Sequence, residues 1–186
     1  IKNKHEHVFF TLDNGEQLRF HDVRKFGKMY LLSKDNYLNE KPLKDMGYEY
    51  DDSLLTASYL YNKLKSKSIP IKTSLLDQSI ITGIGNIYDD EILFLSKISP
   101  HRKSNLVTME ECDSIIKNTR TVLNHAIELG GTTIKSFTSS EGVHGLFQNE
   151  LLVHGKKNDK CPTCGTTLKV DKINGRSSYY CPKCQI

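Results

Sequence analysis

Four cysteines near the end of the sequence are the residues whose type and spacing most clearly indicate chemistry. They form two C-x-x-C pairs, CPTC and CPKC, separated by 16 residues, which is inside the spacing range of a four-thiolate zinc site. Each pair offers two sulfur ligands from one tight turn, and four thiolates leave no coordination position for water or substrate. We therefore expect one structural zinc ion, bound by Cys161, Cys164, Cys181 and Cys184.

The alternatives for these cysteines are a pair of disulfides or two redox-active motifs. Neither is favoured, because no basic segment followed by an apolar stretch near the first residue indicates secretion, and intracellular disulfides are rare. The fifth cysteine, Cys112, falls on the apolar face of a predicted helix. We expect it to lie in the core rather than to act as a nucleophile.

The residues between the two cysteine pairs predict a β-hairpin. Its strands are expected at 168–170 and 178–180, with Asn174 and Gly175 as the turn, because both residues tolerate positive φ. Arg176 follows the turn directly, where its guanidinium could bind a phosphate. An arginine that is simply exposed to solvent explains the residue equally well at this point.

A second candidate group is the segment HDVRKFGKMY, residues 21–30, which places Arg24, Lys25 and Phe26 beside a glycine. Strands are predicted at 8–12 and 17–20 around a hairpin turn at Asp13-Asn14-Gly15, and again at 28–32. The candidate group is therefore a connection between strands. On these residues alone it is either an innocuous surface loop or a group that contacts a ligand.

Helical patterning dominates the middle of the chain, after a polar linker at residues 34–50. The longest helix begins with a capping box made by Thr108 and Glu111 and is stopped by Gly130 and Gly131. Shorter helices are predicted at 54–65, 72–77 and 87–97. The long helix is expected to bury Cys112, Ile115, Ile116, Thr119, Val122, Leu123, Ala126 and Ile127.

The composition is that of an ordinary globular protein, with 37% hydrophobic and 26% charged residues among 186 and a net charge of +4. No apolar run approaches the roughly 18 residues that span a bilayer, so we expect a cytoplasmic protein without a membrane partner. The surplus of positive charge lies in residues 147–186, which indicates a polyanionic partner. These residues contain seven Lys or Arg (156, 157, 160, 169, 172, 176 and 183) and three acids (150, 159 and 171).

Three features together resemble the formamidopyrimidine-DNA glycosylase family: the segment LLDQSIITGIGNIYDDEILF (75–94), the long capped helix, and the two C-x-x-C pairs with Gly175 and Arg176 between them. The resemblance implies a multidomain α+β fold: an N-terminal β-sandwich, a helix-two-turn-helix domain and a C-terminal four-cysteine zinc finger. We expect the last strands of the sandwich at 1–33, the linker at 34–50, the helical domain at 51–146 and the zinc finger at 147–186.

The resemblance also implies an activity and a partner. Members of the family act in base excision repair, as bifunctional glycosylases and AP lyases that remove 8-oxoguanine and formamidopyrimidine from double-stranded DNA. We therefore expect a bacterial, monomeric protein whose partner is DNA with oxidised bases. The family's nucleophile is an N-terminal proline, followed by a catalytic glutamate, and this sequence contains neither. We expect the chain to bind DNA without cutting it, and no catalytic residue is assigned.

The resemblance carries further roles onto individual residues. Asn86, Arg176 and Lys72 are expected to bind DNA phosphates. Arg24 and Phe26 are expected to fill the void left by an everted base, as in the family motif D-P-R-R-F-G, from which this sequence departs by Val23 and Lys25. The lesion-recognition loop is expected at Thr138, Ser139, Ser140, Glu141, Gly142, Val143, His144 and Gly145.

Two other functions stay open at this point. One is the endonuclease VIII branch of the same superfamily, which acts on oxidised pyrimidines; the Arg24-Lys25-Phe26 segment and the full recognition loop favour the purine branch. The other is a non-catalytic zinc-ribbon module that binds nucleic acid, for which a larger basic surplus would be expected. His154 stands where many relatives have an aromatic residue, which puts the phosphate contact of that position in question.

Overall fold

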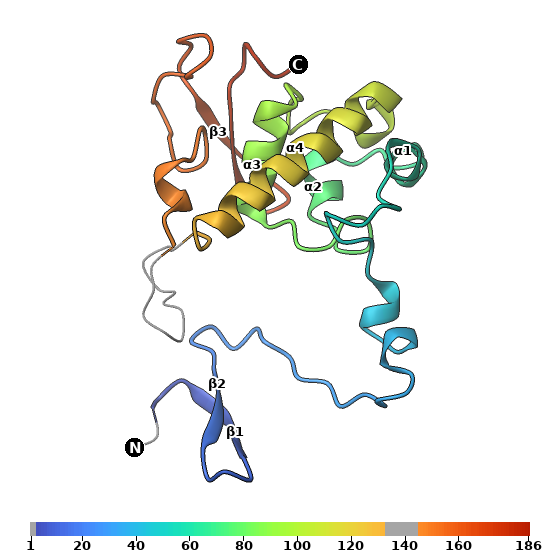
Figure 1. Cartoon of the computed structure of the whole chain (residues 1–186). Helices are drawn as coiled ribbons and strands as arrows, with labels where there is room; N and C mark the ends of the chain where they lie inside the picture. Colours follow the sequence, from blue (N-terminus) through green and yellow to red (C-terminus); the bar gives the residue numbers. More distant parts are fainter. Residues whose placement is uncertain (1–2, 133–144) are drawn as a thin grey trace. The chain divides into compact units, whose positions relative to one another are not determined.

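A computed structural model describes residues 3–132 and 145–186 (Figure 1). The chain divides into two compact units, the first ending at Lys44 and the second beginning at Asp45. The first unit contains one antiparallel hairpin, made of β1 (Glu6–Thr11) and β2 (Gln17–His21). The turn between these strands contains Gly15 at φ +81°, a left-handed conformation that suits glycine.

Residues 28–32 do not form the predicted third strand. They have no regular backbone pairing, and Leu31 is fully exposed. An alternating apolar pattern becomes a strand only when another strand satisfies its backbone groups. In the described part of the first unit, β1 and β2 satisfy each other, and short 3-10 turns follow instead at Tyr37–Asn39 (η1) and Leu43–Asp45 (η2).

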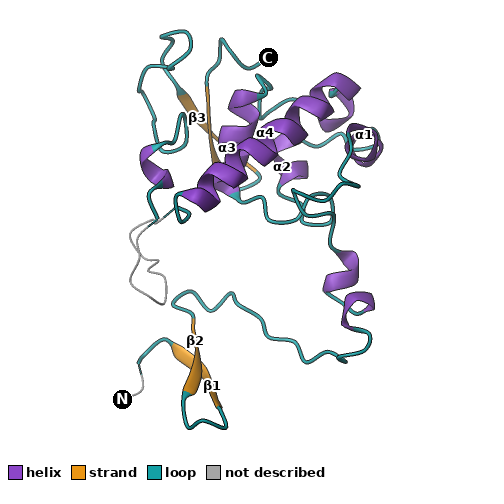
Figure 2. Ribbon diagram, in the orientation of Figure 1, coloured by secondary structure: helices purple, strands orange, loops and turns teal. Residues whose placement is uncertain are grey.

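Helices form the body of the second unit (Figure 2). The first, α1 (Ala57–Leu64), begins later than predicted because the hydroxyl of Thr56 accepts a hydrogen bond from the Tyr59 N–H and caps the helix there. The others are α2 (Ile71–Leu75), α3 (Asn86–Leu95) and α4 (Met109–Glu128), with 3-10 turns η3 (Ser104–Leu106) and η4 (Phe147–Asn149). None of the helices in the described ranges has the length and apolar character to cross a membrane.

The longest helix, α4, confirms the predicted capping box: Thr108 and Glu111 each satisfy a backbone N–H of the other. Its apolar face packs into the main core together with Leu60, Ile71, Leu75, Ile92 and Leu93 from the other helices. One expected core residue is wrong, since Ile127 is 63% exposed. It lies one residue beyond the buried stripe that ends at Ala126.

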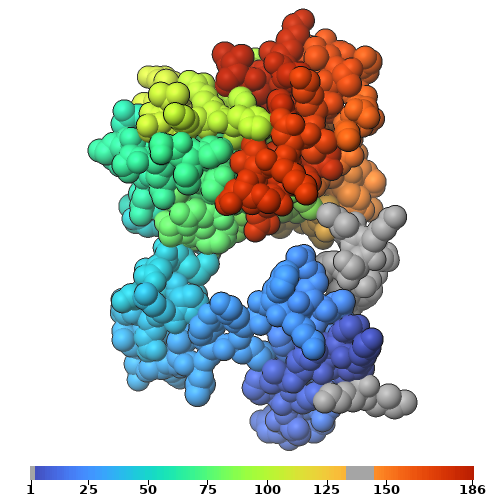
Figure 3. Space-filling model, turned by 180° about the vertical axis from the view of Figure 1, so that it is seen from behind, coloured from blue at the N-terminus to red at the C-terminus, as the bar shows by residue number. Residues whose placement is uncertain are grey.

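The C-terminal hairpin consists of β3 (Lys169–Ile173) and β4 (Arg176–Tyr180), which pair antiparallel with Ile173 opposite Arg176. Asn174 and Gly175 form the predicted turn, with φ of +47° and +76°. This is the backbone that a two-residue turn with the twist of its strands requires. The hairpin packs against α3, and the red C-terminal residues lie against green helical residues in Figure 3.

Candidate zinc centre and phosphate-binding residues

The four predicted cysteines lie close together in the folded chain. Their Sγ atoms are all within 4.8 Å of one another, with Cys161 to Cys184 at 3.8 Å and Cys164 to Cys181 at 3.5 Å. A tetrahedron with Zn–S bonds of about 2.3 Å has edges of about 3.8 Å, so this arrangement fits one zinc ion. The zinc ion would have a structural role, because the four thiolates complete its coordination.

The surroundings of these thiols favour metal binding. Cys161 and Cys181 are buried beside Phe94, Val153 and Leu168 in a small core that is separate from the main one. Hydrogen bonds from Thr166 lower the pKa of Cys164 to about 6, which favours the thiolate that a metal requires, whereas the neighbouring Cys164 sulfur raises the pKa of Cys184 to about 12 and burial raises the pKa of Cys181. By contrast, burial raises the pKa of Cys112 to about 12, as expected for a core cysteine rather than a nucleophile.

Asn86 and Arg176 lie at neighbouring positions on different elements. Asn86 is the first residue of α3, and its Nδ2 donates to the backbone carbonyl of Ser177 at 3.0 Å. Arg176 is the residue before Ser177 and the first of β4. No side chain caps the first turn of α3 after Gly85, so backbone N–H groups are left there for an anion.

The prediction that Lys72 contacts a DNA phosphate is wrong for this structure. Its side chain is completely buried, with Nζ 2.5 Å from Asp90 Oδ1 and 3.6 Å from Asp89 Oδ2. A buried ammonium needs a counter-ion, and two acids on α3 supply it. Burial of the ammonium between these acids is incompatible with the predicted contact at the surface.

Asp89 forms a buried cluster with Lys72 and Asp90, and it was not predicted from the sequence. Its side chain is fully buried, and neither carboxylate oxygen has a hydrogen-bond partner within the described residues. Burial raises the pKa of Asp89 well above its usual value, against the opposing attraction of Lys72. Three consecutive acids, Asp89 to Glu91, directly before the apolar residues 92–95 of the same helix are the feature of the sequence that could have indicated this cluster.

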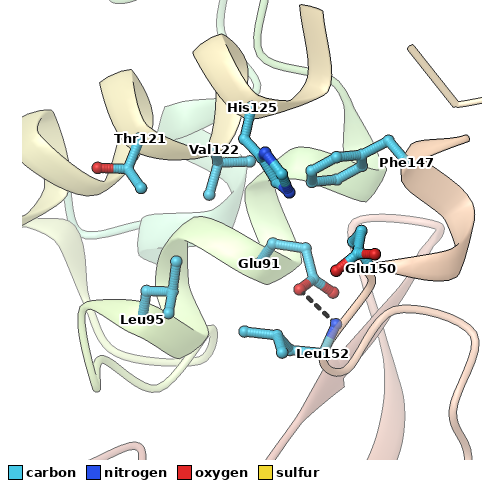
Figure 4. A pocket seen from close by; sticks show the side chains of 8 residues that line it. All are labelled: Glu91, Leu95, Thr121, Val122, His125, Phe147, Glu150 and Leu152. Carbon is cyan, nitrogen blue, oxygen red and sulfur yellow. Dashed lines mark hydrogen bonds between the residues drawn. The ribbon is translucent and has the colours of Figure 1, made fainter. Parts of the chain in front are cut away.

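Glu91 organises the junction between the helices and the zinc-binding residues. Its carboxylate accepts three backbone N–H groups, from Leu152 at 2.7 Å, Val153 at 3.0 Å and His154 at 2.8 Å. Figure 4 shows the carboxylate beside a cavity of about 230 Å³ between α3, α4 and η4. The side chain is 2% exposed, so these three bonds are well shielded from water.

His154 extends the buried cluster toward the zinc hairpin. Its Nδ1 lies 2.7 Å from Asp90 Oδ2, and its ring makes an edge contact with Tyr179 of β4 at a centroid distance of 5.0 Å. The cluster therefore runs from Lys72 on α2, through Asp90 on α3, to the hairpin. This position keeps a ring in place of the aromatic residue of many relatives, but its polar edge faces Asp90.

Arg24 and Phe26 lie in the first unit on a tightly bonded turn. The Asp22 carboxylate accepts from the backbone N–H groups of Arg24, Lys25 and Gly27 at 2.6 to 3.0 Å. The guanidinium of Arg24 lies over the Phe26 ring, 4.7 Å from its centroid, and that ring is 72% exposed. The turn thus presents one stacked cation and aromatic pair to solvent.

Most of the predicted lesion-recognition loop lies outside the described residues, which resume at Gly145. Gly145 is buried against the glycines that end α4, and a Cβ atom there would lie 2.1 Å from the Gly131 carbonyl oxygen. Only glycine fits this close approach. One end of the predicted loop is therefore attached to the end of α4.

The helical body and the four-cysteine hairpin define a helix-two-turn-helix protein with a zinc finger. The family description "Formamidopyrimidine-DNA glycosylase H2TH domain" matches residues 46–138, and "Zinc finger found in FPG and IleRS" matches residues 158–186. These matches cover the body and the hairpin separately. Together with the relatives described next, they identify the family.

Relatives are similar along almost the whole chain. A formamidopyrimidine-DNA glycosylase of Bacillus cereus is 45% identical over 98% of this chain and 66% of the relative, and that of Ureaplasma parvum is 42% identical over 97% and 66%. The chain belongs to the formamidopyrimidine-DNA glycosylase family. It spans about two thirds of the length of these relatives.

Solved structures agree with this assignment. MutM (FPG) from Thermus thermophilus superposes with a TM-score of 0.90 at 33% identity, covering 100% of this chain and 70% of that one. Lactococcus lactis Fpg in complex with DNA containing an abasic site superposes with a TM-score of 0.88 at 35% identity, covering 100% and 68%. The predicted fold class is therefore confirmed, as is the zinc finger.

Proposed function

We propose that the protein acts in base excision repair of oxidised purines, 8-oxoguanine and formamidopyrimidine, as a bifunctional glycosylase and AP lyase. The residues described above would bind double-stranded DNA, fill the void and help to evert the base. The family's catalytic proline and glutamate have no counterpart among these 186 residues, so we assign no catalytic role here. We further propose a monomer that works in the bacterial cytoplasm, with the domain boundaries given by the sequence.

The observation that carries this proposal is the bond between Asn86 and the zinc hairpin. It fixes an amide at the start of α3 beside Arg176, so two donors from different elements can bind adjacent phosphates of one strand. Holding two adjacent phosphates of the DNA backbone in this way favours rotation of a nucleotide out of the base stack. Eversion costs a few kcal/mol, and that cost is lowest at damaged or abasic positions.

Arg24 and Phe26 would occupy the space that the everted base leaves. The exposed Phe26 ring can stack on neighbouring bases, and the guanidinium held over it can donate to the base that has lost its partner. Both side chains come from a turn held by Asp22, so little ordering is required before insertion. Their void-filling role is proposed from this exposure and stacking.

A binding comparison tests the proposal. The chain is titrated into a duplex with one abasic analogue and into the same duplex undamaged, with Phe26→Ala and Arg24→Ala as variants. We expect each variant to lose about tenfold in affinity for the abasic duplex, and far less for the undamaged one. Phe10→Ala, which removes an exposed ring from β1, is the matched control and should leave both affinities unchanged. Equal losses on the two duplexes would refute the void-filling role.

A further inference from the structure

Three side chains form a hydrogen-bonded group where the zinc hairpin meets the loop after α3. His101 Nε2 lies 2.9 Å from Asp171 Oδ2, and the Tyr180 hydroxyl donates to the same oxygen at 2.7 Å. The His101 and Tyr180 rings meet edge to face at 5.4 Å. One carboxylate oxygen thus joins β3, β4 and a residue 70 positions earlier in the chain.

This group is one of several connections that hold the hairpin and the residues after it to the helical body in the described part of the chain. Near the turn, Asn86 bonds the carbonyl of Ser177. At the C-terminal end, Gln185 Nε2 donates to the Ile98 carbonyl at 3.0 Å. These two connections reach β4 and the residues after it, whereas the His101 bond reaches β3. Together they restrain both strands of the hairpin.

The position of Asp171 links this group to Arg176. Asp171 lies two residues before Ile173, which pairs directly with Arg176, so the separation along the strand is about 7 Å. A hairpin of two strands has little stiffness of its own. A restraint on β3 at this distance therefore limits how far the backbone that carries Arg176 can move.

The charge of Asp171 makes its role testable. It is an acid in a segment rich in lysine and arginine, and hydrogen bonds from Tyr180 and then His101 lower its pKa, so it carries a negative charge near neutral pH. Lys169 on the same strand adds to this effect. By electrostatics alone, removing this charge would strengthen binding to a polyanion.

We propose that His101, Asp171 and Tyr180 are positioning residues that hold the zinc hairpin so that Arg176 meets a DNA phosphate. This inference rests on the proposed function, because it presupposes the phosphate contact of Arg176. None of the three residues needs to touch DNA. They contribute by orienting Arg176, the residue of the same hairpin that is proposed to bind the phosphate.

The test is a substitution for which positioning and electrostatics predict opposite changes in DNA affinity. Asp171→Asn removes a negative charge, yet we expect it to weaken binding to an abasic-analogue duplex about three- to fivefold, because exposed charge-assisted bonds are individually modest. Asp159→Asn is the matched control, an acid of the same segment outside this group, and should leave binding unchanged or slightly tighter. Tighter binding by Asp171→Asn would overturn the proposal.

A double-substitution cycle isolates the route through Arg176. If His101 acts by positioning, His101→Leu should weaken binding in the wild-type background and have less than a twofold effect in Arg176→Gln. His101→Gln keeps a donor for Asp171 without a charge and should restore most of the affinity, which a direct phosphate contact by His101 would not allow. Equal effects of His101→Leu in both backgrounds would refute the inference.

The two proposals fail in different ways. If Arg176→Gln itself leaves DNA binding and its salt dependence unchanged, the proposed phosphate contact is wrong. If Arg176→Gln weakens binding but the His101 and Asp171 variants do not, the contact stands and the positioning role is wrong. Zinc content and thermal unfolding of each variant, compared with wild type, verify that the hairpin is still folded.

Discussion

Asn86 and Ser177 are joined by a 3.0 Å hydrogen bond although 91 positions separate them in the sequence. The amide of Asn86 donates, and the carbonyl that accepts is next to Arg176. Of the two side-chain hydrogens of this amide, one is used inside the protein and one remains for a ligand. Asn86 can therefore place the zinc hairpin and bind a phosphate at the same time.

The Asn86 and Arg176 pair gives a prediction about salt dependence. If Arg176 makes the proposed phosphate contact, replacing it with Gln removes that contact, so the slope of log Kd against log salt concentration should fall by about 0.9. Asn86→Ala should weaken binding as well, and the double variant should lose less than the sum, because Asn86 also holds the hairpin. Fluorescence anisotropy between about 50 and 200 mM salt, a range that resolves such slopes, measures this.

Lys157→Gln is the control for that experiment, since it removes a cation from the same segment at a position away from the hairpin turn. Its slope should stay close to that of the wild type. If the slope falls as much for Lys157→Gln as for Arg176→Gln, then a general loss of charge explains the result. The specific contact of Arg176 would then be refuted.

Removing zinc should unfold the C-terminal hairpin and leave the helices folded. The cysteines and their neighbours form a small core of their own, whereas α4 packs in the main core. We expect a chelator, or Cys164→Ser, to abolish amide protection in β3 and β4 and to abolish DNA binding. Hydrogen exchange and far-UV circular dichroism follow the two parts separately, and Cys112→Ala, a buried cysteine outside the site, should keep the zinc.

Glu91 should be critical for attaching residues 152–154 to α3. A Gln side chain has one acceptor oxygen where the carboxylate has two, so Glu91→Gln strands at least one buried backbone N–H of Leu152, Val153 or His154. We expect a loss of about 2 kcal/mol in the free energy of unfolding. Denaturant titration measures it. Glu150→Gln, at the exposed rim of the same cavity, should cost almost nothing.

Asp89 gives a prediction about stability and pH. Its folded pKa is raised well above that of the unfolded chain by burial, so the native state holds a proton that the unfolded state releases. This stabilising contribution is complete below the unfolded pKa, near 3.8, and is lost as pH rises through the folded pKa. Asp89→Asn should therefore stabilise the protein at pH 8, by on the order of 1 kcal/mol.

The advantage of Asp89→Asn should shrink as pH falls toward 4, where the wild-type carboxyl is protonated and equally neutral. Thermal unfolding at several pH values measures the difference. Asp113→Asn, on the exposed face of α4, is the control and should show no such trend. A constant difference between Asp89→Asn and wild type at all pH values would mean that this carboxyl is ionised throughout.

Features set by short stretches of sequence were predicted well. The spacing of the cysteines, the Asn174-Gly175 turn and the capping box of α4 each depend on a few consecutive residues, and all three are present. Local patterns suffice here because the turn and cap geometries follow from residue type. The boundaries of the domains, and the DNA contacts of the individual residues, stay predictions.

Features set by tertiary packing were not predictable in this way. From the sequence, Lys72 is expected to be a surface cation, and only the fold places it beside Asp89 and Asp90. The three backbone bonds of Glu91 cross about 60 positions, which no local pattern encodes. Residues 28–32 have the apolar alternation of a strand, but a strand also needs a partner for its backbone.

The turn around Asp22 has a consequence for the conformational entropy that DNA binding would cost. The backbone N–H groups of Arg24, Lys25 and Gly27 all donate to the Asp22 carboxylate, and Lys25 adopts a left-handed backbone with φ of +56°. Their conformational entropy is lost when the chain folds, so the proposed insertion of Phe26 into a duplex would incur little of that loss again. The family's proline at position 23 restricts the backbone covalently; here, with Val23, a carboxylate does so through hydrogen bonds. The rigidity of the turn that carries Arg24 and Phe26 then depends on the ionisation of Asp22 rather than on a proline ring.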